Sequence, residues 1–386
     1  MLKQVQHDKQ KITSYKFNVH IMIIGVDGNE ANVEHKVGVS VYTLQLLSYF
    51  KKHATKDIQF VIFLRIAPRS ELPRESEFYT YKIVSGPLLW SQLFLPFHLW
   101  TRKLRKKNID VFFSPAHYIP RFCPFKTVVT IHDLSYLYFP EEFLKKDLYQ
   151  LREWTTYALK KSSSVIAVSK TTKKDLIKEY KIPEAKINVV YNGYEGHFPA
   201  TKKAFQIKID DPYILYVGTI QPRKNVQTLI KSFALFKKNH PEFKLVLVGK
   251  KGWLTENIFA SVPKDMKDDI MFTGYVDDEE KNELYRKAFC FVLPSLYEGF
   301  GIPLLEAMSH HCPVISSFSS SLTEVGGEAC LYFDPKSYTD LEEKLETLFE
   351  NKELRSEMIA KGNKQITRFS WEKMGKETLD ILTTVK

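Results

Sequence analysis

Short hydrophobic runs alternate along this chain with longer segments in which apolar residues recur every three or four positions. The runs are typical of buried strands, and the intervening segments have the period of amphipathic helices. Strands that alternate with helices in this way form parallel sheets with helices on both faces. We predict strands at 19–28, 59–64, 82–85, 111–114, 127–133, 163–169, 187–193, 212–220, 243–249, 269–276, 289–295, 314–317 and 330–335. We predict helices at 42–50, 149–160, 170–180, 226–239, 278–288, 337–349 and 369–386.

The alternation is interrupted near residues 196–211, where the periodicity is lost before a new strand begins. A chain of 386 residues is longer than one hydrophobic core usually grows, so two domains are expected. We place a first domain at 19–200 and a second at 205–370. Residues 1–18 are polar and irregular, and we expect them to be a loose tail.

The stretch 291–317 has the order strand, glycine loop, helix, strand. Backbone N–H groups at a glycine loop and a helix N-terminus favour a diphosphate. Two glutamates frame this loop, Glu298 and Glu306, and carboxylates accept hydrogen bonds from sugar hydroxyls. Two alternatives stay open: Glu306 caps the helix from its third position, and Glu298 is a solvated loop residue.

Further polar residues follow predicted strands. His132 ends the strand 127–133, and Arg223 and Lys224 lie between the strand 212–220 and the next helix, beside Gly218. The carboxyl ends of parallel strands are where open α/β sheets bind ligands. Two adjacent cations there suit a leaving diphosphate, although a solvated pair of loop charges is the alternative.

Gly38 lies before the first predicted helix, in a strand, glycine loop, helix unit. The loop lacks the G-x-G-x-x-G spacing of dinucleotide sites. Gly38 would either let the backbone approach a ligand closely or relieve crowding in a turn.

The formal charge of +11 is uneven, because residues 1–200 carry 30 Lys and Arg against 18 Asp and Glu, whereas residues 201–386 carry 26 against 27. Such an excess suits an acidic partner, although a lysine-rich solvated surface explains it as well. Residues 87–107 combine the aromatic residues Trp90, Phe94, Phe97 and Trp100 with a basic cluster at 102–107. This segment either rests on an anionic membrane or packs as a helix against the sheet with a solvated charged end.

The four cysteines lie far apart and form no C-x-x-C pair, so we expect neither a zinc site nor a disulfide framework. The apolar run after residue 19 is too short for a secretory leader and is followed by no cleavage site, and no transmembrane helix is predicted. We expect a cytoplasmic protein, with peripheral contact to the inner face of the membrane as an addition.

Four segments together make the chain resemble the family-4 glycosyltransferases of the GT-B fold, the retaining nucleotide-sugar group. They are GVSVYTLQLL at 38–47, TIHDLSYLYFPE at 130–141, YVGTIQPRKNVQTLIKSF at 216–233 and SLYEGFGIPLLEAMSHHCPVISS at 295–317, whose two glutamates form the family's Glu-x7-Glu pair. The resemblance implies two Rossmann-like, doubly wound domains that face a central cleft. It also implies that the helix at 371–386 crosses back to the first domain.

The resemblance further implies roles for matching positions. Arg223 and Lys224 would bind the donor diphosphate and stabilise the charge that develops on it. Glu306 would hold ribose hydroxyls, and Glu298 would hold the hexose. Gly38, Gly218, Phe300, Gly301 and Ile302 would complete the donor site, and His132 would face it from the first domain. Glu324 matches a frequent family glutamate of less certain function.

From this resemblance we expect transfer of a hexose, with mannose from GDP-mannose favoured over a UDP-hexose. The acceptor would be a glycan or a lipid-linked sugar of cell-surface polysaccharide synthesis. No metal and no cofactor are expected, since no Asp-x-Asp motif is present. The alternative is a catalytically silent GT-B protein that binds a nucleotide sugar or a polymer. A nucleic-acid partner is not expected, because no base-stacking or groove-reading motif appears.

Overall fold

The computed structural model describes residues 21–36, 38–87, 89–196, 207–252 and 256–385, so the predicted tail at 1–18 lies outside the described residues. The first part of the chain contains β1 (Met22–Asp27), α1 (Val39–His53), β2 (Ile58–Leu64), β3 (Tyr79–Ile83), α2 (Phe94–Leu104), β4 (Val111–Ser114), β5 (Lys126–Ile131), α3 (Ser135–Tyr138), α4 (Lys145–Lys161), β6 (Ser164–Ala167), α5 (Lys170–Tyr180) and β7 (Ile187–Val189). Short 3-10 turns include η1 (Asn29–Ala31), η2 (Pro140–Glu142) and η3 (Glu184–Lys186).

The second part follows the same alternation. It contains β8 (Tyr213–Val217), η4 (Pro222–Lys224), α6 (Val226–Phe236), β9 (Lys244–Val248), α7 (Glu256–Ala260), η5 (Lys264–Met266), β10 (Ile270–Gly274), α8 (Asp278–Lys287), β11 (Cys290–Leu293), α9 (Ile302–Ser309), β12 (Val314–Ser317), α10 (Leu322–Gly326), η6 (Gly327–Ala329), β13 (Cys330–Phe333), α11 (Tyr338–Glu350), α12 (Lys352–Ile366) and α13 (Trp371–Thr384).

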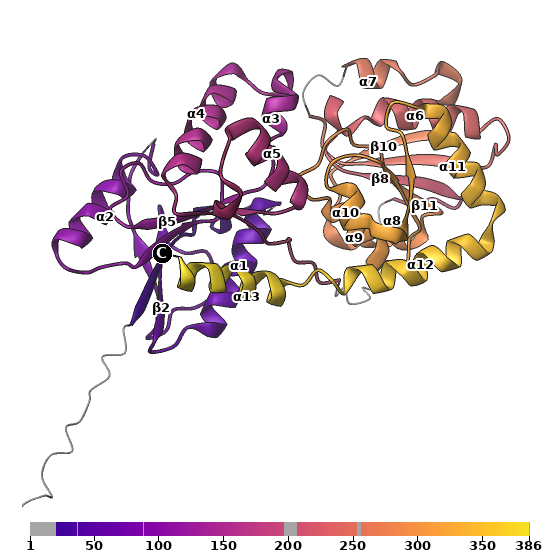
Figure 1. Cartoon of the computed structure of the whole chain (residues 1–386). Coiled ribbons are helices and arrows are strands. Elements are labelled where there is room, and N and C mark those ends of the chain that lie inside the picture. The colour runs from indigo at the N-terminus through magenta and orange to yellow at the C-terminus, as the bar shows by residue number, and fades with distance from the viewer. Residues whose placement is uncertain (1–20, 37, 88, 197–206, 253–255, 386) are drawn as a thin grey trace, which may run out of the picture.

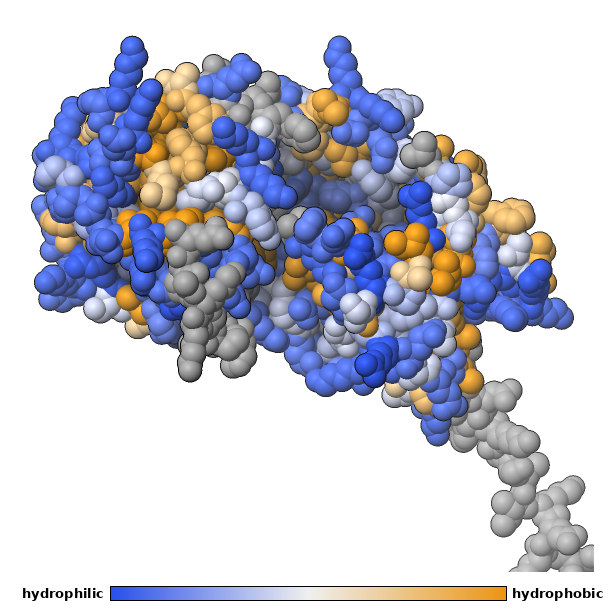
Figure 2. Space-filling model, turned by 180° about the vertical axis from the view of Figure 1, so that it is seen from behind, coloured by the Kyte–Doolittle hydropathy of each residue, from blue (hydrophilic) through white to orange (hydrophobic). Residues whose placement is uncertain are grey.

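The strands form two separate parallel sheets, which lie side by side with helices around each (Figure 1). The first has the order β3-β2-β1-β4-β5-β6-β7, and the second has the order β10-β9-β8-β11-β12-β13. In both sheets the order reverses next to the first strand of the domain, which is the doubly wound arrangement. The predicted fold class, α/β with two Rossmann-like domains of the GT-B type, is confirmed. Figure 2 shows that the surface is hollowed between the two halves.

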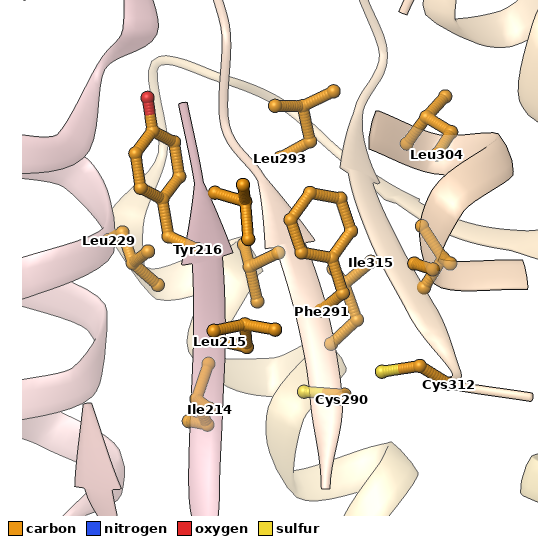
Figure 3. Packing of buried hydrophobic residues seen from close by; sticks show 14 of the residues in the cluster. Ile214, Leu215, Tyr216, Leu229, Cys290, Phe291, Leu293, Leu304, Cys312 and Ile315 are labelled. Atoms are coloured by element: carbon orange, nitrogen blue, oxygen red, sulfur yellow. The ribbon is translucent and has the colours of Figure 1, made fainter. Parts of the chain in front are cut away.

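The core of the second domain shows why these runs form parallel strands. Leu215 on β8 pairs with Phe291 on β11, and Phe291 pairs in turn with Val314 on β12. All three side chains are buried, because helices cover both faces of a parallel sheet. Figure 3 shows Phe291 between the side chains of neighbouring strands, with Leu304 of α9 to its upper right. The strand ends that carry polar loops are therefore held on a rigid apolar base.

Helix α5 was predicted with its correct bounds because its start signal is strong. Ser169 is the N-cap, and its side chain accepts a hydrogen bond from the Thr172 N–H. Helix α13 begins in the same way at Ser370 and then packs against α1 of the first domain. Met374, Leu379 and Leu382 join the apolar core that contains the first strands.

Two local predictions were wrong. The strand predicted at 82–85 is β3, which begins at Tyr79 and ends at Ile83, since the fully buried Tyr79 pairs with Phe60 of β2. Helix α12 was missed because Gly362 and Gln365 lie on its buried face, and neither residue adds to a hydrophobic pattern.

Of the two interpretations that the sequence left open for residues 87–107, the packing of a helix against the sheet is confirmed, and the membrane contact stays a prediction. Leu95 and Leu99 of α2 pack with Phe63 and Phe112 of the sheet, and Trp90 is buried beside them. Phe97 is 72% exposed, so the four aromatic residues do not share one face. Among the described residues, no helix is long and apolar enough to cross a membrane. The four cysteines are free thiols.

Candidate active site

The polar residues of the second domain meet where the order of its sheet reverses, between β8 and β11. Arg223 and Lys224 belong to η4, which follows β8 after residues 218–221, and Glu298 lies in the loop after β11. The Leu296 N–H donates to the Arg223 carbonyl oxygen at 2.9 Å, and the Asn225 side chain donates to the Pro294 carbonyl oxygen at 3.1 Å. These bonds hold the two loops side by side at the carboxyl edge of the sheet.

Glu298 is paired with both predicted cations. The Lys224 Nζ donates to its Oε1 at 2.5 Å, and the Arg223 Nη1 lies 3.7 Å from its Oε2. Burial opposes the charge of Glu298, but Lys224 and Arg223 together lower its pKa. The side chains of Arg223, Lys224 and Glu298 are 12%, 16% and 12% exposed. The alternatives of a solvated glutamate and a solvated cation pair are therefore wrong.

The loop after Glu298 leads into α9. Gly301 is the N-cap residue of this helix, with φ +109°, which favours glycine. Phe300 and Gly301 therefore bring backbone N–H groups to the N-terminus that begins at Ile302, where the helix dipole favours an anion. The loop is anchored because Ser321 Oγ donates to the carbonyl oxygens of Glu298 and Phe300, at 2.8 and 2.9 Å.

Glu306 lies two residues further along α9 than the third position, from which a cap would act. The helix begins at Ile302, so Glu306 is its fifth residue, and the capping alternative is wrong. Its Oε1 accepts from the Lys281 Nζ and its Oε2 accepts from the Tyr285 hydroxyl, both at 3.0 Å. Burial opposes the charge of Lys281, whereas Glu306 and Asp278 raise its pKa. Lys281 and Tyr285 both lie on α8 and had no distinguishing signal in the sequence.

His132 reaches the site from the first domain, directly after β5. Its Nε2 lies 2.8 Å from the Pro115 carbonyl oxygen, and its ring centroid lies 4.8 Å from that of Tyr42. Burial and the nearby His117 lower the pKa of His132 to about 4, so the imidazole is neutral at neutral pH. Since Nε2 donates to that carbonyl in the neutral ring, Nδ1 is left as an acceptor.

The two predicted glycines differ in their surroundings. Gly38 is the N-cap residue of α1 with φ +45°, and a Cβ there would meet no described atom within 4 Å. The space beside Gly38 is therefore open, and the crowding alternative is not supported. Gly218 follows β8, where its carbonyl oxygen packs against Gly249 at the end of β9. A Cβ at Gly249 would lie 2.0 Å from that oxygen.

Three carboxylates join the two domains, and the sequence did not single out two of them, Glu142 and Asp175. Glu142 of η2 contacts Arg223, and Asp175 Oδ2 accepts from the Tyr297 hydroxyl at 2.7 Å. Glu324, whose function the sequence left uncertain, accepts from the backbone N–H groups of Lys170 and Thr171 at 2.9 and 3.0 Å. These two N–H groups form the N-terminus of α5, which favours a carboxylate. The structure thus places Glu324 at the domain interface.

Both halves of the chain match known families. Residues 37–195 match the family described as Glycosyltransferase Family 4, and residues 197–365 match Glycosyl transferases group 1. The O-antigen chain mannosyltransferase B of Escherichia coli is 30% identical over 287 residues, 72% of this chain and 75% of that protein. The O-antigen chain mannosyltransferase RfbU of Salmonella typhimurium is 31% identical over 248 residues, 64% of this chain and 66% of that protein.

Solved structures share the architecture. The sucrose-phosphate synthase of Thermosynechococcus elongatus superposes with a TM-score of 0.70 at 19% identity, covering 94% of this chain and 98% of that one. Anabaena HepE in complex with UDP and glucose superposes with a TM-score of 0.67 at 15% identity, covering 95% of this chain and 100% of that one. At these identities the likeness concerns the fold alone.

Proposed function

This chain belongs to the family-4 glycosyltransferases of the GT-B fold, and from this we propose that it moves mannose from GDP-mannose to a glycan or lipid-linked acceptor of cell-surface polysaccharide. The mannosyl donor is favoured because the two relatives described above are O-antigen mannosyltransferases. Transfer would retain the configuration at the anomeric carbon and would require no metal ion.

One observation carries the proposal: two cations and a carboxylate converge beside a helix N-terminus at the reversal point of the second sheet. Arg223 and Lys224 would receive the donor diphosphate together with the N–H groups at the start of α9. As the bond between the anomeric carbon and the diphosphate oxygen breaks, negative charge collects on the diphosphate. Buried cations stabilise that charge better than water does. They would take the place that a magnesium ion has in other transferases.

The remaining residues would orient the sugars. Glu298, held by Lys224, has a carboxylate that accepts hexose hydroxyls, and Glu306 would accept ribose hydroxyls. His132 would face the hexose from the first domain with a neutral ring. The acceptor hydroxyl would enter from the first domain, pass its proton to an oxygen of the departing diphosphate and bond to the anomeric carbon on the face that the diphosphate leaves.

A peripheral membrane contact is a further part of the proposal. One face of α2 is apolar and exposed, and residues 103 and 105–107 beside it are exposed lysines and an arginine. The face consists of Leu93, Phe97, Trp100 and Leu104. Successive members are four, three and four positions apart, a spacing that places them on one side of a helix. Apolar side chains with flanking cations suit an anionic lipid surface. Helix α2 is at the left of Figure 1, so it lies at the right-hand end of Figure 2, which shows the molecule from behind. Hydrophobic surface is visible at that end.

The proposal is tested with purified protein, GDP-mannose, UDP-glucose and a lipid-linked glycan acceptor. Turnover of GDP-mannose should exceed that of UDP-glucose and should persist in EDTA, and the anomeric NMR signal of the product should show retention. Arg223→Ala or Lys224→Ala should each lower the rate by about 10²–10³. Lys231→Ala, an exposed lysine of α6, is the matched control. A silent protein would bind GDP-mannose without turnover in any of these assays.

A further inference from the structure

Glu142 of the first domain contacts Arg223 of the second, and we propose that it is a positioning residue that aims the diphosphate-binding guanidinium only when the two domains are closed. This inference rests on the proposed function. The family resemblance assigned no role to Glu142, which directly follows the segment 130–141 that carries part of that resemblance. Its place in η2 puts it across the cleft from η4.

Both oxygens of Glu142 are used on the same partner. Oε1 accepts from the backbone N–H of Arg223, and Oε2 accepts from the Arg223 Nε at 3.4 Å. On its other side the guanidinium donates through Nη1 to the Tyr297 carbonyl oxygen at 3.0 Å. The stem of Arg223 is therefore held by the first domain, and its tip is held by the loop of Glu298. A side chain clamped at both its stem and its tip has one orientation.

Burial makes this contact conditional on closure. The Glu142 side chain is 2% exposed and the Arg223 side chain is 12% exposed. Burial raises the pKa of Glu142, and the hydrogen bond from the Arg223 N–H and the charge of Arg223 oppose that rise. A carboxylate this deeply buried needs a partner for its charge, because an unpaired one is strongly destabilising. When the domains separate, water would solvate both groups and Arg223 would lose its fixed orientation.

The surrounding contacts hold η2 in register with the second domain. The Tyr297 hydroxyl accepts from the Leu134 N–H at 3.3 Å and donates to Asp175, both in the first domain. Leu134 lies a few residues before η2, so the closure that joins it to Tyr297 also brings Glu142 to Arg223. Residues of both domains thus fix the orientation of the Arg223 guanidinium. An open enzyme that holds a donor but lacks this alignment would hydrolyse it slowly, which protects the donor until the acceptor-side domain has closed.

A positioning role predicts a specific kinetic pattern. Donor binding in the open form depends on the second domain, so the KM for the donor should change little when Glu142 is removed. The transition state needs the aligned guanidinium, so kcat should fall, and a misplacement of about 1 Å can cost on the order of 10²-fold in rate. If Glu142 instead competed with the diphosphate for Arg223, its removal would tighten donor binding.

The experiment compares Glu142→Ala, Glu142→Gln and Glu141→Ala in the full chain, with GDP-mannose or, where turnover is faster, UDP-glucose. Glu141 is exposed on the same turn and is the matched control. Glu142→Ala should lower kcat at least tenfold with KM within twofold. Glu142→Gln keeps one acceptor for the Arg223 N–H and should recover part of the loss. Glu141→Ala should match the wild type.

Several outcomes would overturn the inference: unchanged kcat in Glu142→Ala, a lower donor KM in that variant, or equal losses in the alanine and glutamine variants. Circular dichroism and thermal unfolding of each variant show whether it is folded. Arg223→Ala is measured in parallel, and Glu142→Ala should add little to its loss if the two residues act as one unit. If Arg223→Ala is fully active, the proposed function itself fails; if only Glu142→Ala is fully active, this inference alone fails.

Discussion

The carbonyl oxygen of His132 lies against Gly299, so closely that a Cβ on Gly299 would be 2.0 Å from it. His132 directly follows β5 of the first sheet, and Gly299 lies in the loop after β11 of the second. Real Cβ atoms are never found at such a distance from an oxygen, so only glycine permits this approach. The contact lies beside Glu298. The width of the cleft at the donor site therefore depends on the absence of a side chain at Gly299.

Gly299→Ala should therefore force the domains apart at the site without unfolding either domain. We expect kcat to fall by on the order of 10²-fold, because a displacement of about 1 Å between reacting groups has that effect. Steady-state kinetics measures the loss, and small-angle scattering should show a larger radius of gyration.

Gly362→Ala is the control for this substitution. Its Cβ would lie 3.2 Å from the Met308 side chain, which can move, and Gly362 lies on α12 away from the interface. We expect wild-type activity from it. Normal activity and an unchanged radius of gyration in Gly299→Ala would show that the contact does not control closure.

Lys281 supports Glu306 from the neighbouring helix, and its removal should weaken donor binding. Lys281→Met keeps most of the apolar stem but leaves Glu306, whose side chain is 17% exposed, without its cation. We expect the KM for the donor to rise about tenfold with a smaller change in kcat, because ribose contacts are made equally in the ground and transition states.

Isothermal titration of Lys281→Met with GDP and with UDP measures the weaker binding directly, as a higher Kd. Lys287→Met, an exposed lysine of the same helix, should bind either nucleotide as the wild type does. A loss confined to kcat would instead place Lys281 with the groups that act on the transition state.

Much of this site could be predicted from the sequence because it follows strand ends. Arg223, Lys224, Glu298 and His132 each come directly after an apolar run, and a parallel sheet brings all such ends to one edge. Glu142 could not be found in this way. It lies in a short turn, its partner is 81 positions away in the other domain, and its burial depends on how the domains meet.

The position of Glu306 shows a second limit. The sequence correctly gives its distance from Glu298, but whether it caps α9 depends on where the helix begins. Gly301 rather than a later residue is the N-cap, since its φ of +109° ends the extended loop. Lys281 and Tyr285 then occupy both oxygens, and no local pattern pairs α8 with α9.

The exposed face of α2 should bind anionic vesicles. We expect the wild type to sediment with vesicles that contain phosphatidylglycerol, to bind less at high salt, and to bind vesicles of phosphatidylcholine weakly. Phe97→Ser with Trp100→Ser should reduce binding by removing apolar side chains that are 72% and 45% exposed. Tyr338→Ser, at an exposed tyrosine of the second domain, is the control. Equal sedimentation of the double variant would exclude this face.

The low pKa of His132 should make the stability of the first domain depend on pH. Its pKa is lowered from 6.5 to about 4, so between these values the unfolded chain binds a proton that the folded chain excludes. Stability therefore rises with pH across this window and is lost as the pH falls from about 6.5 towards 4. The whole shift corresponds to about 3 kcal/mol in the free energy of unfolding.

Urea unfolding followed by tryptophan fluorescence measures this loss, since Trp90, Trp100 and Trp154 all lie in the first domain. Between pH 7.5 and 4.5, the free energy of unfolding of His132→Gln should fall by about 2–3 kcal/mol less than that of the wild type. The pKa of His310, in the second domain, is also lowered to about 4. The unfolding transition of the second domain should therefore still lose stability as the pH falls, in His132→Gln as in the wild type. If His132→Gln and the wild type lose stability in parallel, His132 is protonated in the folded protein, and its neutral role opposite Glu298 cannot hold.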